Sequence, residues 1–250
     1  MQLQALIDSI EIHTKGVFNK ISVIYKADDE HKAGYDLFSK RKPAIEMIEQ
    51  GDFKTDLLSL FEYEYTCFAA DDDIVYRDFN KALLQEIKSD VSCFSLRLGL
   101  NVDYCYSNNL PNKIGKYEQN GDFITWNWRE QSLDFGYPLS VVSHVFRTND
   151  IEALSRLEEY TDPNTYEMKL QKHLDKLPDK IVSYKESRIF GVPANRVNTT
   201  TNNRNGLTYA YSTEDLLSRY LQGYIIDISS MNYVINAAQQ EIEYKFKNYG

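Results

Sequence analysis

The stretch Thr66–Tyr76, with the sequence TCFAADDDIVY, decides how the fold is interpreted. An apolar run typical of a buried strand ends in three consecutive carboxylates, Asp71, Asp72 and Asp73, and a second apolar run follows directly. Carboxylates at a strand end can bind a hard divalent cation, which in turn can bind a diphosphate. Aspartates also favour turns, so an acidic turn between two elements is the simpler alternative. The stretch alone leaves both interpretations open.

The first hundred residues alternate between helical and strand-like patterns. Apolar residues at helical spacing predict a helix over 3–13, and the β-branched run 20–25 predicts a buried strand. A polar loop is expected over 28–34, and helical turns around Pro43 are expected within 35–49. Helices over 56–61 and 78–88 and strands over 65–70 and 91–98 complete the series. This alternation predicts an α/β fold with a single, mostly parallel central sheet flanked by helices. Ligands bind at the carboxyl ends of such strands, which favours the cation interpretation of the aspartates.

After Asn101 the chain becomes richer in loops. Strands are predicted over 123–128 and 138–147, and helices over 149–159, 163–177, 212–221 and 234–246. Ser212 is expected to be the N-cap of the third of these helices. The segment 192–207 is long, polar and without periodicity, which is typical of a functional or mobile loop. No linker divides the chain.

Composition excludes some classes of protein. The net charge of −9 argues against a nucleic-acid partner, because phosphate backbones require a basic surface. No apolar run is long enough to span a membrane, and no signal peptide is evident at the first residues. Cys67, Cys93 and Cys105 are widely spaced, which predicts reduced thiols in an intracellular, cytoplasmic protein.

The segments CFAADDDIVYRDF, CFSLRLGLN, ITWNW and GYPLSVVSHVFRTNDI together resemble the GT-A glycosyltransferases. More narrowly, they are similar to a branch found in bacteria and in large DNA viruses of algae, for which host cytoplasm is the expected location. The resemblance implies one domain over 1–250, with a nucleotide-binding half (1–100) and an acceptor-side half (101–250). It implies an inverting hexosyltransferase that moves a sugar from a nucleotide-diphosphate donor, most simply a UDP-sugar, to a glycan hydroxyl. The implied cofactor is Mn²⁺ or Mg²⁺, bound by a DxD motif at Asp71–Asp73.

The resemblance also implies roles for individual residues in donor binding. Asp73 would bind the cation, Asp71 would lie near the ribose and the metal, and Asp72 is an alternative ligand because three aspartates leave the register open. His144 would be a third metal ligand, although a histidine in an apolar run can equally be a core residue. Further donor contacts are implied for Tyr25, Lys26 and Arg97, of which Arg97 would pair with a triplet carboxylate or with the diphosphate.

Transfer to a hydroxyl needs a base, and the acceptor-side half offers candidates. Asp134 is the first choice and Glu130 the second, against the alternative of a solvated loop carboxylate. Trp126 and Trp128 lie two residues apart on a predicted strand and face one side, where they could contact a sugar ring or pack in the core. The polar segment Asn195–Asn205 could close over the donor.

One departure from the GT-A pattern concerns the first strand. The chain starts at Met1–Gln4 in what is predicted to be the helix that follows that strand, so the N-terminal first strand is apparently missing. Either the sequence starts after that strand or the sheet lacks a central strand. A true absence would weaken nucleotide binding and leave the neighbouring strand edges unpaired. Two other functions therefore stay open, namely a non-catalytic nucleotide- or carbohydrate-binding module on a degenerate GT-A scaffold and a metal-dependent nucleotidyltransferase or phosphohydrolase.

Overall fold

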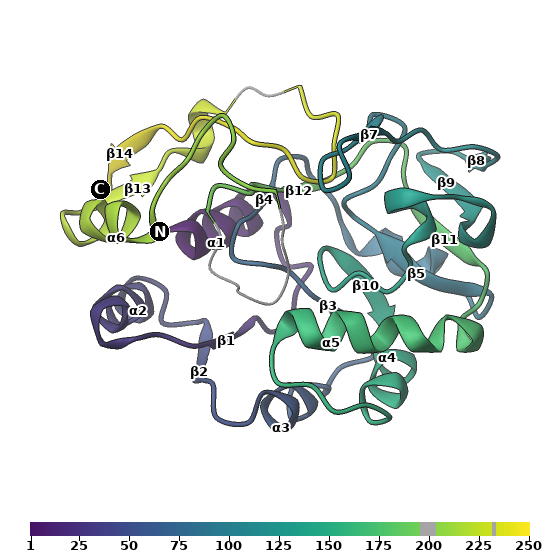
Figure 1. The fold of residues 1–250 in the computed structure, drawn as a ribbon, viewed down its shortest axis with the longest axis horizontal. Coiled ribbons are helices and arrows are strands. Elements are labelled where there is room, and N and C mark those ends of the chain that lie inside the picture. The colour runs from purple at the N-terminus through teal and green to yellow at the C-terminus, as the bar shows by residue number, and fades with distance from the viewer. Residues whose placement is uncertain (196–203, 232–233) are drawn as a thin grey trace.

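A six-stranded mixed sheet forms the centre of the computed structural model, which describes residues 1–195, 204–231 and 234–250 (Figure 1). The helices are α1 (Gln2–His13), α2 (Asp29–Arg41), α3 (Phe53–Leu58), α4 (Thr148–Ser155), α5 (Pro163–Leu170) and α6 (Thr213–Leu221). The 3₁₀ turns are η1 (Lys81–Glu86), η2 (Trp128–Glu130), η3 (Leu133–Gly136), η4 (Gln171–Lys176) and η5 (Ile228–Ser230). The strands are β1 (Ser22–Tyr25), β2 (Glu46–Glu49), β3 (Tyr65–Cys67), β4 (Asp73–Val75), β5 (Val91–Ser95), β6 (Tyr104–Cys105), β7 (Leu110–Pro111), β8 (Glu118–Asn120), β9 (Phe123–Asn127), β10 (His144–Arg147), β11 (Lys180–Tyr184), β12 (Ile189–Gly191), β13 (Tyr224–Ile226) and β14 (Phe246–Asn248).

The α/β class is confirmed, but the prediction of a mostly parallel sheet is wrong. The strand order is β3-β10-β5-β11-β9-β8, and within it only β5 and β11 run parallel. Strands β8 and β9 are joined by a tight turn in which Gly121 has a φ of +58°, which fixes them as an antiparallel hairpin. Strand β10 enters the sheet from a loop instead of a crossover helix, so it can run antiparallel to both of its neighbours.

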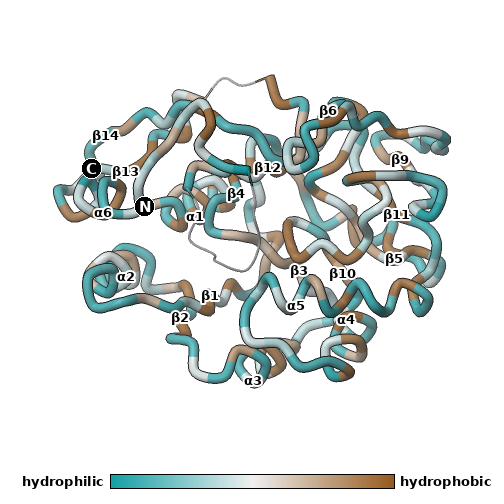
Figure 2. The backbone as a smooth tube through the Cα atoms, in the orientation of Figure 1, coloured by the Kyte–Doolittle hydropathy of each residue, from teal (hydrophilic) through white to brown (hydrophobic). Residues whose placement is uncertain are grey.

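The N-terminal part differs from the prediction at two places. Residues 29–41, of which 29–34 were expected to be loop, form α2, with Asp28 as N-cap accepting a hydrogen bond from the His31 N–H at 2.8 Å. The segment after Pro43 forms β2 instead of a helix. Helix α2 is hydrophilic (Figure 2) and buries only Gly34 and Phe38. A Cβ at Gly34 would lie 2.8 Å from Leu217 Cδ1, so close packing against α6 stabilises a helix whose sequence has little apolar signal.

Strands β1 and β3 each have an unpaired edge. β1 pairs only with β2, in parallel, and β3 pairs only with β10, among the residues that the structure describes. Lys20 Nζ donates to Glu62 Oε2 at 3.1 Å just before the two strands begin. Beyond their ends, burial and then nearby Asp71 raise the pKa of Tyr35 to about 12, and Tyr35 stacks on Tyr25 of β1. Side-chain contacts therefore relate the starts of the two strands, and no backbone pairing joins β1 to β3 in the described residues.

The C-terminal segment is extended, so the predicted helix over 234–246 is wrong. Single bridges join Ala237 to Tyr104 and Gln239 to Gly191, and β14 then pairs with β13. Ile242 and Tyr244 alternate with exposed neighbours, which suits an extended chain that buries every second side chain. Helix α6 agrees with the prediction, because Ser212 Oγ accepts from the Asp215 N–H at 3.0 Å.

The largest hydrophobic cluster lies where α3, α4 and α5 pack on the sheet. Trp126 and Trp128 belong to it and are buried, so the core interpretation of these two residues is confirmed and the sugar-contact interpretation is wrong. Hydrophobic residues concentrate along the central strands (Figure 2). All three cysteines are free, as predicted, although Cys67 is only half-buried.

Candidate functional site

The three aspartates form the turn between β3 and β4. The Asp73 N–H donates to the Ala70 carbonyl at 3.1 Å, and Asp73 is the first residue of β4, opposite Gly191 of β12. Exposure falls steeply along the triplet: Asp71 is exposed, Asp72 is half-buried and Asp73 is 1% exposed. The triplet therefore leads from the surface into the protein.

One carboxylate oxygen of Asp73 accepts hydrogen bonds, and the other has no hydrogen-bond partner in the described residues. Oδ2 accepts hydrogen bonds from the Ala70 N–H at 3.0 Å and from Ser143 Oγ at 3.1 Å. Oδ1 is buried and has no hydrogen-bond partner among the described residues. Burial raises the pKa of Asp73 to about 6, against the lowering effect of these two donors. A buried carboxylate oxygen without a partner is costly, so this atom is suited to a ligand that supplies positive charge.

The pKa values of the other two carboxylates, Asp71 and Asp72, are also raised. The surrounding protein partly removes Asp71 from water and raises its pKa. Burial raises the pKa of Asp72 further, and the negative charges of Asp73 and Asp71 add to this effect. Burial, and then the negative charge of Asp72, also raises the pKa of Tyr244, which belongs to the C-terminal segment. A cation at the turn would relieve this repulsion among three neighbouring acids.

A second charged cluster surrounds Arg97, which forms an ion pair with Asp134. The other Asp134 oxygen accepts from Asn112 Nδ2 at 2.8 Å, and Arg97 Nη1 donates to Ser140 Oγ at 3.3 Å. The expected pairing of Arg97 with a triplet carboxylate is therefore replaced by a pairing with Asp134, although Arg97 lies near enough to lower the pKa of Asp73. Asp134 is not a solvated loop carboxylate, because its side chain is almost buried.

The candidate bases differ in their freedom to accept a proton. Each oxygen of Asp134 accepts one hydrogen bond, from Arg97 or from Asn112, and keeps a further lone pair that can accept a proton. Glu130 is exposed in η2 and forms no ion pair or hydrogen bond with the described part of the chain. Their roles in catalysis stay predictions.

His144 lies inside the protein, with 0% exposure. Its Nδ1 lies 3.2 Å from the Pro138 carbonyl and 3.5 Å from Cys93 Sγ, whereas its Nε2 has no partner in the described residues. Burial lowers its pKa to about 3, so the ring is neutral. Over residues 1–195, 204–231 and 234–250, no three His, Cys, Asp or Glu side chains gather as metal ligands. Asp71, Asp73 and His144 are thus not brought together as the expected set of three.

The residues fit one kind of cation site better than another. A closed cage needs several protein ligands, which are not assembled here. Mg²⁺ is commonly bound through one or two carboxylates together with the phosphates of a substrate and several waters. Asp73 Oδ1 and the adjacent Asp72 offer this smaller set. The site therefore fits a divalent cation that binds together with a diphosphate.

Tyr25 and Lys26 lie at the carboxyl end of β1, beside the acidic turn. The Tyr25 ring stacks on Tyr35 with centroids 4.4 Å apart and an angle of 25° between the planes, and Lys26 is exposed. Asn195 donates to Gln2 Oε1 at 3.1 Å, whereas residues 196–203 of the predicted lid lie outside the described residues. Sequence reasoning missed Tyr35, Ser143 and Tyr244, of which only Ser143 had a signal, its position next to His144.

No family model and no curated protein matches this chain. Within the described part of the chain, every helix is too short or too polar to cross a lipid bilayer.

Proposed function

We propose that the protein is a metal-dependent glycosyltransferase that uses a nucleoside-diphosphate sugar, with UDP as the leading nucleotide, and transfers the sugar to a glycan hydroxyl with inversion. The observation that carries the proposal is the buried Asp73 at the inner end of an acidic turn, whose Oδ1 has no hydrogen-bond partner in the described part of the chain. The proposal includes a cytoplasmic location and no nucleic-acid partner.

Each group at the turn has a task in this reaction. Ala70 and Ser143 hold Oδ2 of Asp73, so that Oδ1 keeps one direction toward the cation. When bound, the cation stabilises the charge that develops on the leaving diphosphate. Tyr25 and Tyr35 offer an aromatic pair for the nucleobase beside the turn. Asp134 is the proposed base, because each of its oxygens keeps a lone pair, whereas Glu130 follows β9 beside Asp179, at the opposite edge of the sheet from the turn.

Calorimetry with UDP, GDP and TDP, each with and without Mn²⁺, tests the proposal. We expect nucleotide binding that requires the cation, no cation binding without nucleotide, and a loss of at least tenfold in nucleotide affinity for Asp73→Ala. Asp36→Asn is the matched control, because Asp36 is an exposed carboxylate on α2. Absence of cation-dependent nucleotide binding in the unmodified protein would refute the proposal, and unchanged binding in Asp73→Ala would remove the acidic turn from it.

The alternative of a non-catalytic nucleotide-binding module is favoured by one observation, the ion pair that holds the candidate base Asp134 to Arg97. Incubation with UDP-sugars and Mn²⁺ separates the two functions. Sugar release or transfer supports the enzyme, whereas cation-dependent binding without turnover supports the module.

A further inference from the structure

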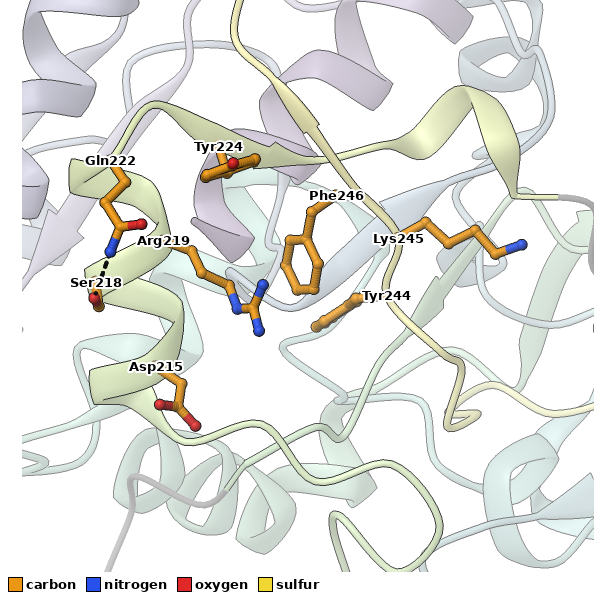
Figure 3. A pocket seen from close by; sticks show the side chains of 8 residues that line it. All are labelled: Asp215, Ser218, Arg219, Gln222, Tyr224, Tyr244, Lys245 and Phe246. Atoms are coloured by element: carbon orange, nitrogen blue, oxygen red, sulfur yellow. Dashed lines mark hydrogen bonds between the residues drawn. The ribbon is translucent and has the colours of Figure 1, made fainter.

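A groove of about 750 Å³ lies between α6 and the C-terminal strand (Figure 3). One wall is the face of α6 that carries Asp215, Ser218, Arg219 and Gln222, which are spaced to lie along one side of a helix. The opposite side is formed by Tyr224, Tyr244, Lys245 and Phe246. The groove is open to solvent, so a ligand in it would stay partly exposed.

The two walls have different chemistry. The helix wall presents polar groups, with Gln222 Nε2 donating to Ser218 Oγ at 3.0 Å. The strand wall is aromatic, and Tyr224 at its end is 37% exposed. A sugar ring matches these two walls. Its hydroxyls can bind the polar side chains of the helix wall, and its C–H face can pack on the aromatic rings of the strand wall.

Arg219 is the distinctive residue of the groove. Its guanidinium lies 4.7 Å from the centre of the Phe246 ring, which orients it, and it forms no hydrogen bond or ion pair with the described residues. Nearby Lys247, in contrast, is paired with Asp227 at 2.8 Å. In a protein with a net charge of −9, an oriented and unpaired guanidinium is suited to an anionic group, which it can bind with two parallel hydrogen bonds.

Asp215 limits which anion fits. It points into the same groove one helical turn from Arg219, and no ion pair joins the two. A phosphate dianion placed on Arg219 would be repelled by Asp215, whereas a carboxylate carries less charge. Asp215 can then accept hydrogen bonds from ring hydroxyls.

From these contacts we infer that the groove binds an acidic sugar, a pyranose ring whose carboxylate pairs with Arg219 and whose ring lies against Tyr224 and Phe246. The groove and the acidic turn have one neighbour in common, Tyr244, which lines the groove and whose pKa is raised by burial and then by Asp72. The inference rests on Arg219, Asp215 and the rings of Tyr224 and Phe246, so it does not depend on the proposed transferase activity.

Calorimetry of the full chain with three probes tests the inference: tri-galacturonate, the neutral galactose trisaccharide and inorganic phosphate. We expect tri-galacturonate to bind at least tenfold more tightly than either of the others. Arg219→Gln should lose at least tenfold in this affinity, and Tyr224→Ala several-fold. Lys247→Gln is the matched control, because it removes a neighbouring cation that does not line the groove, and it should bind tri-galacturonate unchanged.

Amide NMR spectra of the same titrations locate the binding. Shifts at α6 and β14 on adding tri-galacturonate, with a native spectrum for the free Arg219→Gln variant, support the inference. It is overturned if phosphate binds as well as tri-galacturonate, if Arg219→Gln binds unchanged, or if no probe shifts these signals.

Discussion

Asp73, which is buried, and Asp134, which is nearly buried, both contact the loop 138–143 or its hydrogen-bond partners, and they differ in their hydrogen bonds. Asp134 accepts from Arg97 and Asn112 with its two oxygens, whereas Asp73 leaves Oδ1 without a partner in the described residues. The loop serves both centres, because Ser140 accepts from Arg97 and Ser143 donates to Asp73. A satisfied carboxylate stabilises the fold, whereas an unsatisfied one weakens it unless a ligand binds. The comparison therefore separates a structural centre from a candidate binding centre.

Asp134→Ala should give the largest effect on stability. It leaves the Arg97 guanidinium buried without its counter-charge, which costs about 3 to 5 kcal/mol of unfolding free energy. Urea denaturation measures this loss. Asp90→Asn is the control, because Asp90 forms an exposed pair with Lys180, and its cost should stay below about 1 kcal/mol. Equal losses in the two variants would contradict the structural role of Asp134.

Asp73 should make stability depend on pH in the direction opposite to an ordinary ion-paired aspartate. Its pKa is raised from 3.8 to about 6 in the folded protein. Between these values the folded state retains a proton that the unfolded state has released, so the unfolding free energy falls as pH rises from about 4 to about 6. The Asp73 contribution is roughly 2 to 3 kcal/mol over this window.

Asp73→Asn removes this contribution, because the amide does not titrate. Denaturant unfolding at a series of pH values should show the variant gaining stability relative to the unmodified protein between pH 4 and 6, with a constant difference outside that window. Parallel pH profiles for the two proteins would show that Asp73 is not perturbed in this way.

Removal of a single donor from each carboxylate should have the smallest effects. Asn112→Ala deprives Asp134 of one donor and should cost about 1.5 to 3 kcal/mol, since the acceptor is charged and paired. Ser143→Ala should cost about 1 kcal/mol or less at pH 5, where Asp73 is largely protonated. Chemical denaturation of both variants at pH 5 compares these costs, and a larger loss for Ser143→Ala would reverse the assignment of the two centres.

Local features of the chain were predictable, whereas pairing partners were not. The amphipathic α1, the Ser212 cap of α6 and the acidic turn at Asp71–Asp73 follow from short-range spacing and turn chemistry. The antiparallel entry of β10 depends on contacts with β3 and β5 far along the chain. For the same reason the donor Ser143, 70 residues from Asp73, could not be assigned to it from sequence, nor could the pairing of Arg97 with Asp134.

Two helix errors have a common physical cause. Helix α2 is polar because its partner α6 needs only a small contact at Gly34 and Phe38, so its periodicity is weak. The segment 234–246 has apolar residues at spacings that suit a helix, yet bridges to Tyr104 and Gly191 hold it extended. In both places tertiary contacts outweigh the local preference.

The small sheet of β1 and β2 and the six-stranded sheet are held in the molecule in different ways. A two-stranded sheet is only marginally stable by itself. β1 and β2 pair with each other, but within the described residues no β-ladder joins them to the six-stranded sheet. Side chains hold the unit of β1, α2 and β2 in place of a β-ladder, because Phe38 is buried in one hydrophobic cluster with Ile7 of α1 and Tyr220 of α6. Because Tyr25 and Tyr35 belong to this unit and Asp71 does not, the packing of this cluster sets the distance between the aromatic pair and the acidic turn.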